Sequence, residues 1–249
     1  MAEYKQYTFC QRPDLIAEAN RINPIAWPEF MLHDPVSNRH WGKLGTRFSD
    51  FQFVLCDQDD QVVAVGNSIP VAWDLSLDDL PDRGWDEMLE KGVGDWERNQ
   101  PANILCALSA VVARPHRGKG LSARVIEGMR SIASKYRYDW LVAPVRPILK
   151  SAYPLTPMER YIRWEQDDGK PFDPWVRTHW RLGASIVKVA PHSMSITGSI
   201  TEWEKWTEMR FPESGPYIVP GALQPVQIDC ENDIGTYVEP NVWMIHKTT

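Results

Sequence analysis

Apolar and polar positions follow one another along the first hundred residues in patterns that predict both helices and strands. Residues 12–22 carry an apolar stripe at helical spacing. Two apolar runs, residues 51–56 and 61–73, flank an acidic turn and predict an antiparallel hairpin. Residues 74–99 are acidic but keep apolar residues at helical spacing, so they predict a further helix.

The middle of the chain continues with a strand, a turn and a helix. The apolar run of residues 104–112 predicts a buried strand, and the helix that follows begins at Leu121. This helix has an apolar stripe formed by Val125, Ile126, Met129 and Ile132. Residues 139–145 predict the next strand. Such an order is typical of an α/β protein, although it is not the regular repeat of a doubly wound sheet.

The composition restricts the classes of function. The chain of 249 residues has 33 acidic and 27 basic residues and a formal charge of −6, which argues against a general nucleic-acid binder. No apolar run is long enough for a membrane span, and the first residues lack the apolar core of a signal peptide. The four cysteines are scattered without a C-x-x-C motif, so we expect no metal site and a cytoplasmic protein.

The turn between the central strand and its helix carries the most specific chemistry. It has the sequence Arg117-Gly118-Lys119-Gly120-Leu121-Ser122. Glycines let the backbone approach an anion closely, and the N–H groups and the dipole of a helix N-terminus favour negative charge. The two basic side chains add positive charge. The turn therefore predicts a binding site for a phosphate or diphosphate group.

Three kinds of phosphate-binding turn compete for this segment. A P-loop fails because Gly120 is followed by Leu121 rather than by lysine. A dinucleotide fingerprint fails because position 123 is alanine and the strand of residues 139–145 ends without an acidic residue. The third pattern, R/Q-x-x-G-x-G/A, matches at Arg117 and Gly120, with Ser122 in place of the usual glycine or alanine.

With this third pattern the chain resembles the GCN5-related N-acetyltransferases. The resemblance implies an α/β fold with a central mixed, mostly antiparallel sheet that is flanked by helices. It also implies a helix over residues 175–182, a turn and strand over residues 183–189, and a last strand over residues 206–211.

The resemblance also suggests how the chain is organised. We expect residues 1–249 to form a single acyltransferase domain. Compared with the family, this domain has insertions near residues 74–99 and 146–172 and a C-terminal extension over residues 212–249.

The resemblance implies that the turn binds acetyl-CoA or coenzyme A, as the co-substrate of an acyltransferase. The backbone N–H groups of the turn would hold the pyrophosphate, and the pantetheine would follow the end of the preceding strand. A small-molecule amine would attack the thioester directly, with the thiolate as leaving group. The implied binding residues are Val111, Val112, Arg114, Arg117, Gly118, Lys119, Gly120, Leu121 and Ser122.

Such a transfer benefits from a base for the amine and an acid for the thiolate. Many members of the family use a glutamate in the central strand as base, but residues 103–112 include no acidic residue. His179 lies four residues before Gly183, where many members have a tyrosine, so His179 is the candidate acid. The alternative is that His179 is an ordinary polar residue of the helix. Tyr153 and Tyr161 are alternative acids.

Basic residues follow the strand that ends at residue 145. In this family the acceptor cleft opens at that point, so we expect Arg146 and Lys150 to bind the acceptor substrate. The alternative is a solvated surface on which such basic side chains pair with neighbouring acidic ones.

Two other functions stay open. The missing glutamate fits a non-catalytic acyl-CoA-binding sensor, and the basic residues fit a transferase that takes its acyl group from a carrier-protein thioester. The expected partner is therefore a small-molecule amine or an acyl carrier, and neither a nucleic acid nor a membrane. The oligomeric state is open, with a homodimer as one candidate.

Overall fold

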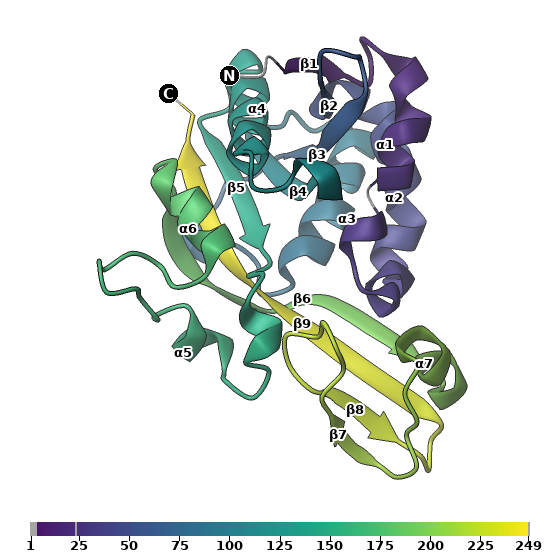
Figure 1. Ribbon diagram of the computed structural model, residues 1–249. Coiled ribbons are helices and arrows are strands. Elements are labelled where there is room, and N and C mark those ends of the chain that lie inside the picture. Colours follow the sequence, from purple (N-terminus) through teal and green to yellow (C-terminus); the bar gives the residue numbers. More distant parts are fainter. Residues whose placement is uncertain (1–3, 23, 249) are drawn as a thin grey trace.

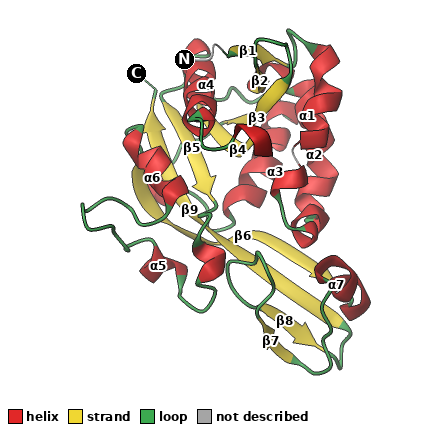
Figure 2. Ribbon diagram, in the orientation of Figure 1, coloured by secondary structure: helices red, strands yellow, loops and turns green. Residues whose placement is uncertain are grey.

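In the computed structural model the described residues, 4–22 and 24–248, form a nine-stranded sheet with helices on both faces (Figures 1 and 2). The strands are β1 (Lys5–Thr8), β2 (Gln52–Cys56), β3 (Val62–Val71), β4 (Ile104–Val112), β5 (Trp140–Val145), β6 (Ser185–Gly198), β7 (Gly215–Tyr217), β8 (Val226–Asp229) and β9 (Ile234–Lys247). The α-helices are α1 (Ile16–Ile22), α2 (Pro35–Arg47), α3 (Gly84–Glu97), α4 (Leu121–Lys135), α5 (Met158–Tyr161), α6 (Pro174–Arg181) and α7 (Ile200–Thr207).

The sheet is mixed and mostly antiparallel, as predicted. Its order is β1-β2-β3-β4-β5-β9-β8-β7, and β6 also pairs with β9. Among the strand pairs of the described chain, β4 and β5 alone are parallel. The predicted hairpin is present as β2 and β3, and the predicted central strand and its helix are present as β4 and α4.

Side chains of the strands alternate between two covered faces of the sheet. In β2, Phe53 and Leu55 pack against α4, whereas Val54 and Cys56 face α1. Figure 1 shows α1, α2 and α3 together on one side, with α4 and α6 apart from them. Because both faces are covered, the central strands are nearly continuous apolar runs. No helix in the described part of the chain has the length and apolarity to cross a membrane.

β4 and β5 pair over a short distance and then part. Their parallel pairing joins residues 104–106 to residues 140–142, and beyond it β4 pairs with β3 while β5 pairs with β9. β4 also contains a bulge, since Asn67 lies opposite Ser109 and Ser68 opposite Ala107, which leaves Leu108 unpaired. The sheet therefore has an opening at the end of β4 that leads into the turn before α4.

The predicted last strand over residues 206–211 is wrong. The first two of these residues belong to α7, which Ser199 and Glu202 cap in a capping box. Trp203 of this helix lies against Gly235 of β9, where a Cβ would overlap the indole ring. The last strand of the sheet is instead β9, which lies between β5 and β6. The residues that the resemblance treats as an extension thus supply a central strand.

Two buried carboxyl groups join the start of α2 to α3. Asp34 caps α2 by accepting from the N–H of Ser37 at 2.6 Å, and Asp86 accepts from the N–H of Ser195 at 3.3 Å. Oδ2 of Asp34 and Oδ1 of Asp86 are buried and have no hydrogen-bond donor among the described residues, which favours a proton on one of the two carboxyl groups. Burial raises the pKa of Asp34 to about 6, and burial together with the charge of Asp34 raises the pKa of Asp86 to about 8.

These raised pKa values predict a protein that loses stability as the pH rises. The protonated pair contributes stability that is fully present below the ordinary aspartate pKa of about 4. That contribution is lost as the pH rises through the higher values of the folded state. We expect the free energy of unfolding, measured by urea titration, to fall by on the order of 2 kcal/mol from about pH 5 to about pH 8.

The substitution Asp86→Asn tests this origin. The amide carries no charge and can donate to Asp34, so the fall in unfolding free energy should become much smaller. Asp79→Asn, at an exposed position before α3, should keep the wild-type slope. An equal slope in Asp86→Asn and in the wild type would contradict the assignment.

Candidate functional site

The predicted phosphate-binding turn forms the start of α4. Gly118 and Gly120 have φ angles of +77° and +78°, in the left-handed region that favours glycine. Gly120 is the N-cap of α4, and no side chain of the described residues caps this helix. The N–H groups of its first turn are therefore available to an external acceptor.

The charge around this turn is positive. The first turn of α4 has no acidic residue, and Arg114, Arg117 and Lys119 are exposed beside it. Nε of Arg117 donates to the carbonyl of Val112 at 3.3 Å, which ties the turn to the end of β4. Positive side chains and the helix dipole act in the same direction, so the turn suits a phosphate group.

A cavity of about 450 Å³, here named the loop cavity, extends from this turn into the opening between β4 and β5. The strands contribute residues 107–112 of β4 and residues 143–146 at the end of β5. Helix α6 contributes Trp175 and His179. The turn and the start of α4 contribute His116, Arg117, Gly118, Leu121 and Ser122.

Most of the predicted binding residues thus lie along this cavity. Val111 and Val112 are part of the lining contributed by β4. The remaining three, Arg114, Lys119 and Gly120, belong to the same turn but stand outside the lining.

A second cavity, of about 460 Å³, lies beside α1 and α2 and is here named the tryptophan cavity. Trp27, Trp41 and Trp85 line it. None of the described residues that line this cavity is charged. Its polar lining consists of Asn20, Ser37, Asn38, Thr46, Asn67 and Ser109.

The two cavities meet at the bulge of β4. Both are lined by Trp27, Trp85, Leu108, Ser109 and Met194. Nε1 of Trp85 donates to the carbonyl of Leu108 at 2.8 Å, so the bulge and the indole are held together. A molecule in one cavity would therefore approach a molecule in the other at this point.

His179 lies in the wall of the loop cavity and is buried. Its Nδ1 is 2.9 Å from Nε2 of His246 in β9, and its ring makes an edge-to-face contact with the ring of Trp175. Burial, and to a smaller extent His246, lowers the pKa of His179 well below its ordinary value. Burial also lowers the pKa of His246 to about 4. Both imidazoles are therefore neutral near pH 7, and one N–H lies between them.

The other predicted catalytic and substrate residues have different positions. Tyr153 belongs to an aromatic cluster with Tyr161, Trp164 and Phe172 and does not line either cavity. The Nζ of Lys150 is buried and donates to the backbone carbonyls of Tyr153 and Leu223. Burial lowers the pKa of Lys150 to about 8. These contacts favour a structural role for Tyr153 and Lys150.

Arg146 does reach the loop cavity, but it has a partner there. Its Nε donates to both carboxylate oxygens of Glu239, at 2.9 and 3.0 Å, and its guanidinium also donates to the carbonyl of Gly221 at 2.6 Å. Glu239 is fully buried. The sequence reasoning missed Glu239 and Trp85, because a single acid in a strand and a single tryptophan in a helix carry no local motif.

No family model matches the sequence. The chain is 35% identical to the arginine N-acetyltransferase avaD of Aspergillus versicolor, over 98% of this chain and 93% of that protein.

Two solved structures are similar in fold. One is the loading GNATL domain of CurA from Lyngbya majuscula, with a TM-score of 0.63 and 17% identity over 99% of this chain and 98% of that one. The other is the GphF GNAT-like decarboxylase in complex with isobutyryl-CoA, with a TM-score of 0.59 and 14% identity over 99% of this chain and 100% of that one. At these identities the two structures establish the fold alone.

The turn can be tested by its affinity for coenzyme A. The double substitution Arg117→Glu and Gly120→Val reverses one charge and places a β-branched residue at a φ of +78°. We expect it to abolish the binding of coenzyme A and acetyl-CoA in isothermal titration calorimetry.

Arg137→Glu is the matched control, because it reverses an exposed charge just beyond the opposite end of α4. It should leave the affinity unchanged. A wild-type protein that binds no coenzyme A at millimolar concentration, or a double variant that binds normally, would rule out the assignment.

Proposed function

The chain belongs to the GCN5-related N-acetyltransferase superfamily, and we propose that it transfers the acetyl group of acetyl-CoA to arginine or to a small arginine-like amine. Members of this family are acyl-CoA-dependent acyltransferases. The similarity to an arginine N-acetyltransferase supports the acceptor class. The loop cavity and the tryptophan cavity meet at the bulge of β4, and this geometry supports a transfer between two bound molecules.

The loop cavity is the proposed site of acetyl-CoA. Its turn would bind the pyrophosphate through the N–H groups that start α4. Beyond residue 106, the edge of β4 that faces β5 pairs with no described strand. Its backbone groups can therefore pair with the amide groups of pantetheine. A pantetheine that follows this edge inward would bring the thioester to Leu108 and Ser109.

The tryptophan cavity is the proposed site of the acceptor. Indole rings attract cations at their faces, so Trp27, Trp41 and Trp85 can hold a guanidinium group. The attacking amine must be neutral, since only the neutral form has a free lone pair. The described lining offers indole faces to a guanidinium, which stays charged, but no counter-charge to an ammonium, so burial favours the neutral form of the amine.

His179 is the proposed donor to the leaving thiolate. For this donation the neutral His179 ring must carry its proton on Nε2, with Nδ1 accepting from the Nε2–H of His246. The Nε2–H of His179 would donate a hydrogen bond to the sulfur as the C–S bond breaks. The amine loses a proton when the new C–N bond forms, and the thiolate takes one up, so the protons balance.

We further propose a cytoplasmic location. The four cysteines are all free thiols, two of them buried, and free thiols fit a reducing compartment. A homodimer stays a prediction.

Turnover tests this mechanism. In an assay of free thiol released from acetyl-CoA in the presence of arginine and related amines, the wild type should be active. His179→Phe should reduce turnover about 100-fold, because the thiolate loses its donor. Binding of coenzyme A without any turnover across the amine panel would instead indicate a sensor.

The matched control is His192→Phe, at an exposed position in β6. It replaces a histidine that lines neither cavity, so it should keep wild-type turnover. Unchanged turnover in His179→Phe would remove His179 from the mechanism.

A further inference from the structure

Glu239 stands out among the residues of the two cavities. It is the single acidic side chain among the described residues that line either of them. All its capacity to accept hydrogen bonds is in use. Oε1 and Oε2 accept from Nε of Arg146, and Oε2 also accepts from the hydroxyl of Tyr237 at 2.9 Å. These donors occupy the carboxylate oxygens, so a role other than taking a proton from the amine must explain the position of Glu239.

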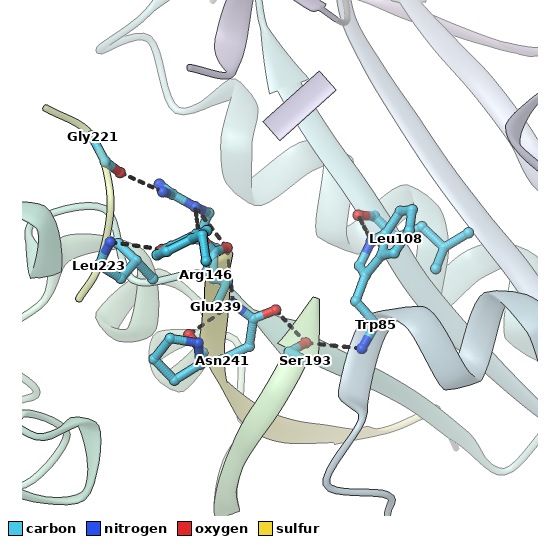
Figure 3. Close-up of polar contacts among 10 residues, drawn as sticks. Trp85, Leu108, Arg146, Ser193, Gly221, Leu223, Glu239 and Asn241 are labelled. Atoms are coloured by element: carbon cyan, nitrogen blue, oxygen red, sulfur yellow. Dashed lines mark hydrogen bonds and ion pairs between the residues drawn. The ribbon is translucent and has the colours of Figure 1, made fainter. Parts of the chain in front are cut away.

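A chain of hydrogen bonds leads away from this carboxylate (Figure 3). Nδ2 of Asn241 donates to Oε1 of Glu239 at 3.3 Å. Oδ1 of Asn241 accepts from the hydroxyl of Ser193 at 2.6 Å, and that hydroxyl accepts from the backbone N–H of Trp85 at 2.9 Å. The chain thus joins β9 to β6 and ends at the first turn of α3.

The donors and acceptors of this hydrogen-bond chain have one consistent direction. The carboxylate of Glu239 accepts only, so the amide of Asn241 must turn its NH₂ toward Glu239 and its oxygen toward Ser193. Ser193 has a single hydroxyl proton, which it donates to Asn241. Its lone pairs therefore face Trp85, whose N–H is one of those that a helix start leaves without an internal partner.

The backbone permits this contact because residue 84 is glycine. Gly84 has a φ of +28°, and a Cβ at this position would overlap the hydroxyl of Ser193. The start of α3 can therefore lie directly against β6.

Each end of the hydrogen-bond chain reaches a tryptophan in the wall that the two cavities share. At one end, the guanidinium of Arg146 lies 5.9 Å from the ring centre of Trp27. At the other end, Trp85 donates to the carbonyl of Leu108 at the bulge and stacks on Trp41 with the ring centres 6.1 Å apart.

We propose that Arg146, Glu239, Asn241 and Ser193 are positioning residues that hold Trp27 and Trp85 at the junction of the two cavities. The inference rests on the proposed acetyl transfer. A shift of the shared wall would misalign the amine with the thioester, and a misplacement of this kind lowers the rate without weakening the binding of acetyl-CoA at the distant turn.

The substitution Ser193→Ala breaks the chain at its centre, and Ser195→Ala is the matched control. Ser195 is on the same strand, but its side chain is exposed. We expect Ser193→Ala to lower kcat about tenfold or more, while the calorimetric Kd for coenzyme A stays within about twofold of the wild-type value. Ser195→Ala should match the wild type in both. Glu239→Gln, which keeps the shape but removes the charge, should act in the same direction as Ser193→Ala.

An NMR signal tests the position of Trp85 directly. The indole N–H resonance of Trp85, assigned by its loss in Trp85→Phe, should shift in Ser193→Ala and stay in place in Ser195→Ala. An unmoved resonance, or a loss of coenzyme A affinity in parallel with kcat, would overturn the proposal. If the wild type binds coenzyme A but transfers no acetyl group, the proposed function fails, and the indole resonance still decides whether the chain positions Trp85.

Discussion

β4 and β5 separate after a short parallel pairing, and the candidate site forms in the opening between them. A pair of parallel strands normally continues its ladder, because unpaired backbone groups inside a protein are costly. Here the ladder ends after residue 106, and each strand keeps a partner on its other side, β3 for β4 and β9 for β5. The opening is therefore stable without being closed. This opening is bordered by the turn of residues 117–120, by α6 and by the bulge at Leu108, which together line the loop cavity.

Three polar pairs are buried in the described part of the molecule, and the free-energy cost of burying each pair is offset in a different way. Arg146 and Glu239 keep both charges and satisfy them with additional hydrogen bonds. Burial raises the pKa of both Asp34 and Asp86, which favours a protonated carboxyl group there, and His179 and His246 are both neutral. Three exposed positive side chains, those of Arg114, Arg117 and Lys119, lie at the turn. The molecule thus separates a charged entrance, suited to a diphosphate, from an interior suited to uncharged reacting groups.

Local sequence patterns were enough to predict the parts of the site that are contiguous in the chain. The strand, the glycine turn and the helix of residues 104–135 have the predicted order, and the spacing between His179 and Gly183 places His179 in the wall of the loop cavity. The prediction of a strand over residues 206–211 is wrong because their aromatic residues suit a strand, whereas the capping box at Ser199 starts a helix earlier in the chain. The hydrogen-bond chain from Arg146 to Trp85 could not be predicted, because two of its contacts, Arg146 with Glu239 and Ser193 with Trp85, join residues 93 and 108 positions apart, which no local period records.

The place of β9 in the sheet has a consequence for how the protein folds during synthesis. β9 is the last described strand to leave the ribosome, yet it is the strand that joins β5 to β6. Until it emerges, β5 presents an unpaired edge and β6 has no described partner. A nascent chain in that state exposes strand edges that invite pairing with other chains. Completion of the sheet, and with it of the site, therefore waits for a late, long-range step.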